Sequence, residues 1–115
     1  MGKVLQPQTE HCLIDLWEAW VDVQEDGQDQ FTLLVVGDIY WKEKNVKPAL
    51  LKRPGQSNNC SELQLEICPG HAWQSGVVRE VRYSELLLKP QQYEKVSVFL
   101  GDQLLTVIDN IEHIR

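Results

Sequence analysis

Cys68 and His71 lie three positions apart, and this spacing brings a thiol and an imidazole onto one turn, which is half of a zinc site. A structural site needs four ligands, so His11 and Cys12 would have to supply the others from the first strand. Cys60 is excluded both as a ligand and as a disulfide partner, because an extended segment would hold it roughly 26 Å from Cys68. We predict no metal and no cofactor. The alternative kept open is a metal-binding or hydrolytic protein that uses the Cys68/His71 loop.

Four carboxylates, Asp22, Glu25, Asp26 and Asp29, crowd a turn that contains Gly27. Clustered carboxylate oxygens are the ligands that calcium prefers. Their spacing does not match the helix-loop-helix calcium pattern, however, so we interpret the cluster as the solvated tip of a hairpin.

A basic stretch follows, with aromatic residues beside it, and cations next to aromatic faces suit nucleic-acid binding. Against this, the net charge of the chain is -6, which disfavours nucleic acid and anionic membranes as partners. We predict neither partner. The cations are Lys42, Lys44, Lys47, Lys52 and Arg53, and the aromatic residues are Tyr40 and Trp41.

Catalytic signatures are missing from the sequence. The chain offers serines, cysteines and three histidines, but it has no strand-turn-helix nucleophile elbow, no P-loop and no dinucleotide-binding glycine pattern. We therefore predict no catalytic residues and expect that the protein is not an enzyme.

The chain has four tryptophans, which is high for 115 residues. Trp17 and Trp20 have opposite parity in a strand, so one of them faces out unless a bulge or a helix brings both inside. Exposed aromatic residues mark contact surfaces, and the candidates here are Trp17, Trp20, Tyr40 and Trp41. We predict a non-catalytic binding or protein-interaction module, whose partner is another protein or a second copy bound through an edge strand or a Trp-bearing face.

The stretch 31–41 is the most strand-like part of the chain and is predicted to be a central strand. It is rich in β-branched and aromatic residues, and one side of it is wholly apolar apart from Gly37. That side carries Phe31, Leu33, Val35, Ile39 and Trp41. We expect residues 12–23 to pair with 30–42 as a long hairpin, although helical spacing in 12–23 leaves a helix open.

Three further segments are predicted as single strands, 48–53, 61–68 and 77–88, and 95–108 is predicted as a hairpin of two strands. Apolar parity changes within 77–88, which predicts a β-bulge near Ser84 and Glu85. In the hairpin, a Gly101–Asp102 turn would place Val98 opposite Leu105 and Val96 opposite Val107. The tail 110–115 is left unassigned.

About seven short strands with regular turns predict an all-β fold, an antiparallel β-sandwich of the immunoglobulin-like kind, with a small β-barrel as the alternative. We expect a single domain over 1–115 in which 1–9 form a flexible tail. Three cysteines leave at least one free thiol, no apolar run approaches the ~20 residues of a membrane span, and the start lacks the apolar core of a signal peptide. These features predict a cytoplasmic protein.

Several motifs follow one another between residues 17 and 102: WEAWVDV, TLLVVGDI, ALLKR, an Asn-containing loop, ELQLEI, VREVRYSE and YEKVSVFLGD. This order resembles a group of small, uncharacterised bacterial proteins, in which a T-L-x-V-x-G strand precedes an L-K-R strand, a Gln-x-x-Asn loop and an L-x-L strand. The resemblance implies an all-β fold and transfers no activity, since fold alone does not define function.

Overall fold

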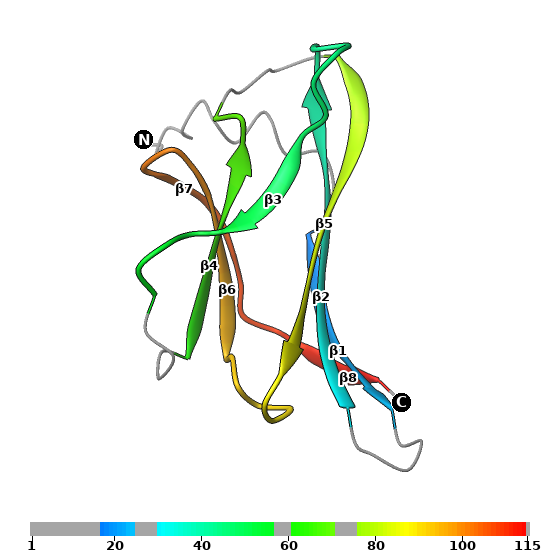
Figure 1. Ribbon diagram of the computed structural model, residues 1–115, viewed down its shortest axis with the longest axis vertical. Coiled ribbons are helices and arrows are strands. Elements are labelled where there is room, and N and C mark those ends of the chain that lie inside the picture. The colour runs from blue at the N-terminus through cyan, green and yellow to red at the C-terminus, as the bar shows by residue number, and fades with distance from the viewer. Residues whose placement is uncertain (1–16, 25–29, 57–60, 71–75, 115) are drawn as a thin grey trace, which may run out of the picture.

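The computed structural model describes residues 17–24, 30–56, 61–70 and 76–114, which form eight strands and no helix. In this part of the chain, therefore, no helix is long and apolar enough to cross a membrane. Figure 1 shows two sheets side by side, one with the strand order β5-β2-β1-β8 and the other with the order β3-β4-β6-β7. The strands are β1 (Glu18–Gln24), β2 (Gln30–Trp41), β3 (Ala49–Lys52), β4 (Glu62–Cys68), β5 (Val77–Leu87), β6 (Lys95–Leu100), β7 (Gln103–Ile108) and β8 (Glu112–Ile114).

The predicted all-β sandwich is confirmed, and both sheets are open, so the chain does not form a closed barrel. The sheets are not wholly antiparallel as predicted. Their pairing is mixed, because β1 with β8 and β4 with β6 run parallel, while the other pairs are antiparallel. For β4 and β6 the reason is the connection. The intervening β5 lies in the other sheet, so the chain returns to β4 in the same direction.

The strand at the centre of the prediction is β2, which lies between β5 and β1. Its apolar side faces inward as expected: Leu33, Val35, Ile39 and Trp41 are buried. Residues 18–24 of the ambiguous segment form a strand that pairs antiparallel with β2, so the helix alternative is wrong for them. Residues 12–16 lie outside the described part of the chain.

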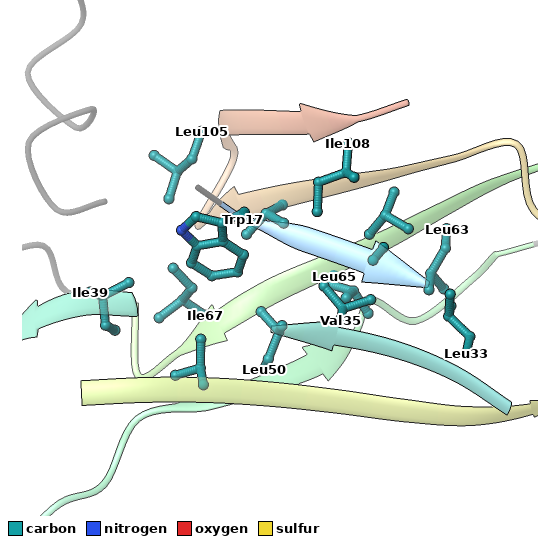
Figure 2. Close-up of a cluster of buried hydrophobic side chains, with 14 of the residues drawn as sticks. Trp17, Leu33, Val35, Ile39, Leu50, Leu63, Leu65, Ile67, Leu105 and Ile108 are labelled. Atoms are coloured by element: carbon teal, nitrogen blue, oxygen red, sulfur yellow. The ribbon is translucent and has the colours of Figure 1, made fainter. Parts of the chain in front are cut away.

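A single cluster of buried apolar side chains joins the two sheets. In the second sheet, Leu63, Leu65 and Ile67 alternate inward along β4, as the sequence predicts. Figure 2 shows these side chains together with Trp17, Leu105 and Ile108. Because both inner faces contribute, neither sheet could bury its apolar side chains alone.

The β-bulge expected near Ser84 and Glu85 is wrong. The pairing of β2 with β5 runs without a shift from Phe31 opposite Leu87 to Trp41 opposite Val77. Leu87 therefore points into the core, and Glu85 shares its side of the sheet. Leu86, which the predicted bulge would have turned inward, is 67% exposed.

A register shift occurs instead in the hairpin of β6 and β7. Its turn lies at Gly101 and Asp102 as predicted, with Leu100 opposite Gln103. Beyond Phe99 and Leu104 the pairing shifts, so Val98 lies opposite Thr106 and Val96 opposite Ile108. The predicted pairings of Val98 with Leu105 and of Val96 with Val107 are therefore wrong. Leu105 is the extra residue of the bulge and still reaches the core.

Gln56 holds the chain that connects β3 to β4. Its side-chain amide donates to the carbonyl oxygens of Arg53 (2.7 Å) and Gln64 (2.8 Å), and its Oε1 accepts from the Gln64 backbone N–H (2.8 Å). These bonds continue the β3–β4 ladder past the end of β3. Gln56 is also the glutamine of the Gln-x-x-Asn loop noted in the sequence.

Candidate functional site

Cys68 ends β4 and is a half-buried free thiol. Its Sγ donates to Oε2 of Glu66 at 3.6 Å, and burial, followed by the hydrogen bond and charge of Glu66, raises the pKa of the thiol. A thiol that keeps its proton is a poor nucleophile and a poor metal ligand. His71 lies outside the described residues, as do His11, Cys12 and Cys60. Within the described residues no three Cys, His, Asp or Glu side chains gather as a metal site requires.

Most of the acidic turn cannot be placed, since Glu25, Asp26 and Asp29 lie outside the described residues. Asp22 is half-buried on β1 opposite Thr32. The predicted hairpin tip itself therefore lies outside the described part of the chain.

The basic stretch is divided by the structure. Lys42, Lys44 and Lys47 are exposed in the connection from β2 to β3. Lys52 is exposed as well, but its Nζ lies 3.6 Å from Glu85 of the other sheet. Arg53 stacks its guanidinium 4.2 Å from the centre of the Phe99 ring. It also donates to the Gly101 carbonyl at 3.1 Å and pairs with Glu66 and Asp102. The five cations therefore do not form one surface patch.

The tryptophan candidates also separate. Trp17 and Trp41 belong to the buried core, so neither presents a contact surface; for these two the predicted role as interaction residues is corrected. They face inward because each shares its strand's apolar side. Trp20 and Tyr40 have the opposite parity and are half-buried on the outer face of the first sheet.

A polar cluster closes the side of the sandwich where β3 and β5 lie close together. Glu85 of β5 accepts hydrogen bonds from the Tyr83 hydroxyl (2.7 Å) and the Tyr93 hydroxyl (2.8 Å), one on each carboxylate oxygen. Lys52 of β3 donates to the Tyr93 hydroxyl at 3.3 Å. Lys52 and Glu85 come from different sheets, so the cluster links the two layers.

The protonation of this cluster favours a structural role over catalysis. Burial, and then hydrogen bonding to Glu85, raises the pKa of both Tyr83 and Tyr93. Burial lowers the pKa of Lys52, but the hydrogen bond to Tyr93 and the charge of Glu85 outweigh it, so the net change is upward. At neutral pH the phenols therefore stay neutral and the amine stays charged, and none of them is poised as a base or nucleophile.

This cluster should make the protein sensitive to alkali. A phenol whose pKa is raised by folding stabilises the native state fully below its unfolded pKa of about 10, and this stabilisation is lost as the pH rises through the folded value. We expect the free energy of unfolding to fall above pH 10, measured by urea denaturation. Tyr83→Phe should flatten the decline, whereas Tyr40→Phe, outside the cluster, should not. Equal behaviour of both variants would contradict this assignment.

An apolar hollow lies at one end of the sandwich. Val23, Phe31, Pro90, Gln91 and His113 line it, and its volume is about 270 Å³. The His113 ring is exposed and its Nε2 lies 3.0 Å from the Pro90 carbonyl oxygen. A single exposed imidazole is not a catalytic arrangement, since the other lining residues include no second titratable or nucleophilic side chain.

The edge of β5 is the most extensive unpaired feature. Within the described residues β5 pairs with β2 alone, and its eleven residues compare with four in β3, six in β7 and three in β8, the other edge strands. Large aliphatic side chains are exposed along it and just beyond its end: Val77, Val78, Leu86 and Leu88, the last 91% exposed. An exposed edge of this length is a template for pairing with another strand.

The charges of β5 alternate in sign. Arg79, Glu80, Arg82 and Glu85 carry two positive and two negative charges, in a chain whose net charge is -6. Glu80 and Arg82 are exposed on the outer face, and Arg82 Nε lies 2.7 Å from Glu80 Oε1. Sequence reasoning considered an edge strand as a contact but not β5. The parity of Leu86 and Leu88, opposite to that of Val81 and Tyr83, could have indicated β5 as a contact strand. The predicted bulge instead assigned both leucines to the core.

No family model, no curated protein and no solved structure matches this chain.

Proposed function

We propose that this protein is a non-catalytic protein-interaction module that binds its partner along the free edge of β5, meaning the edge that does not face β2. The observation that carries the proposal is the length of this edge strand together with its exposed aliphatic side chains. Strand addition joins a partner through main-chain hydrogen bonds and uses alternate side chains for specificity. Among the described edges, β5 offers the most of both.

The chemistry of the polar side chains supports a non-catalytic role. The Tyr83, Tyr93 and Cys68 side chains all have raised pKa values. They keep their protons at neutral pH, and the two tyrosines satisfy the Glu85 carboxylate. Among the described residues, which include Cys68 but not His71, no observation favours the alternative metal-binding or hydrolytic function at the Cys68/His71 loop.

The proposal extends to the kind of sandwich and its setting. Two four-stranded sheets around one core support an immunoglobulin-like fold. The free thiol of Cys68 supports a reducing compartment, in agreement with a cytoplasmic protein. A bacterial origin rests on the sequence resemblance.

Site-specific photo-crosslinking in cells that express the protein tests the proposed edge. A photoreactive residue at Ser84, exposed on β5, should give adducts with protein. The same residue at Gln103, exposed on the β7 edge of the other sheet, should give none. Both positions are polar and lie on edge strands, so they are matched in environment. Equal yields at the two positions, or no adducts at Ser84, would show that β5 is not the binding edge.

A further inference from the structure

We propose that the partner of β5 is a second copy of this chain, bound edge to edge about a twofold axis at Val81. This inference depends on the proposed use of β5 and adds the identity of the partner. Opposed residues of an antiparallel pair lie on the same face of the sheet, so a twofold axis between two identical strands passes where one residue meets its own copy. The sequence of β5 can therefore be tested residue by residue for the position of that axis.

The charges of β5 favour a twofold axis at Val81. With the axis there, Glu80 lies opposite Arg82 of the second copy, and Arg82 lies opposite Glu80 of the second copy. Because Glu80 and Arg82 already pair within each chain on the exposed outer face, four charges of alternating sign would surround the axis. Moving the axis one residue either way would instead oppose Glu80 to Glu80 or Arg82 to Arg82, and like charges directly opposite are destabilising.

The other positions agree with this register. Arg79, exposed on the inner side of β5, comes opposite Tyr83 of the second copy, where a guanidinium and an aromatic ring suit each other. Leu86 comes opposite Gly76, which directly precedes β5, and lies diagonal to Val78 at roughly 7–8 Å. The exposed Leu86 and Val78 would thus cover each other at both ends of the joint.

The local charge balance explains why the second copy is preferred over an unrelated strand. Two chains of net charge -6 repel each other over most of their surfaces. The four charged residues of β5 sum to zero, since Arg79 and Arg82 offset Glu80 and Glu85. Charged side chains protect an edge against self-pairing when like charges meet, whereas the charges of this edge are complementary to their own copies.

Exchanging the charges at positions 80 and 82 tests the register directly. The association of the chains is measured by sedimentation velocity. The wild-type chain should sediment as a dimer. Arg82→Glu and Glu80→Arg should each weaken the dimer at least roughly tenfold, since each replaces two attractive pairs by two repulsive ones. Mixed in equal amounts, the two variants should form a heterodimer, in which every opposed pair has opposite signs again. Both residues are exposed, and circular dichroism should show that each variant folds.

Three results would overturn the proposed pairing of two copies about Val81. They are a monomeric wild-type chain at every concentration, a dimer that survives both single exchanges, and single exchanges that do not recover on mixing. If the chain is monomeric while Ser84 still captures a different protein, the interaction module stands and only the identity of its partner is wrong. If Ser84 captures nothing, the module itself fails.

Discussion

Replacing Gly37 by alanine is expected to destabilise the protein by about 2–4 kcal/mol, although alanine is normally the better residue in a strand. Trp17 directly precedes Glu18, which pairs with Val36, so Trp17 lies opposite Gly37. A Cβ at position 37 would come within 2.1 Å of the Trp17 ring. No contact of this kind is tolerated, so the indole or the strand must move.

Two opposing contributions decide whether Gly37→Ala stabilises or destabilises the protein. Removing a glycine from a strand stabilises by roughly 0.5–1 kcal/mol through backbone entropy. Overpacking a core costs about 1–3 kcal/mol, and expelling a buried tryptophan approaches the 3–5 kcal/mol of its deletion. Figure 2 shows the Trp17 indole within the core cluster near Leu105 and Ile67, so an expelled ring would leave a cavity between the sheets.

A double-mutant cycle provides the control for Gly37→Ala, measured by urea denaturation followed by circular dichroism. Trp17→Ala alone should cost about 3–5 kcal/mol. In the Trp17→Ala background, Gly37→Ala should cost little or should stabilise, because the atoms that it meets are gone. If Gly37→Ala costs the same in both backgrounds, the contact with Trp17 is not the reason for the glycine.

Trp41→Ala is expected to cost about 4–6 kcal/mol, which is comparable to the whole stability of many domains of this size. Trp41 is 1% exposed and is the largest fully buried side chain in the described part of the protein. Its Nε1 also donates to the Val46 carbonyl at 2.6 Å. One side chain therefore fills the core at the end of β2 and holds the connection to β3.

Two further variants serve as controls for Trp41→Ala. Trp41→Phe keeps most of the apolar area but loses the donor to Val46, and should cost about 1–3 kcal/mol. Trp20→Ala removes a tryptophan that is only half-buried on the outer face, and should cost about 1 kcal/mol. Circular dichroism is the readout, since each variant changes fluorescence. If Trp41→Ala costs no more than Trp20→Ala, Trp41 does not anchor the core as the structure indicates.

The two tryptophan classes matter for function. Trp17 and Trp41 stabilise the sandwich, so losing binding by mutating either would report unfolding rather than a lost contact. Glu80, Arg82, Ser84 and Leu86 are exposed on β5, and changes there test the interaction without removing core atoms. This separation makes the charge-exchange experiment interpretable.

The sequence by itself determined the strands and the inward sides of most of them. Alternation is a local property, so the buried sides of β2 and β4 could be predicted without knowing any partner. Only the tertiary structure decided how the strands pair. The short β8 joins β1 in parallel although its segment carries no clear pattern of its own.

The polar cluster around Glu85 also depends on both the local sequence and the tertiary structure. By polarity alone Glu85 belongs outside and Leu86 inside, and a bulge was predicted to achieve this. The structure keeps Glu85 inward because Tyr83 and Tyr93 donate to it and Lys52 balances its charge. Leu86 is thereby exposed on the β5 edge. Tyr83 is a neighbour of Glu85 on β5, but Lys52 comes from β3, distant in sequence, and Tyr93 from the chain before β6. Only folding brings these two to Glu85.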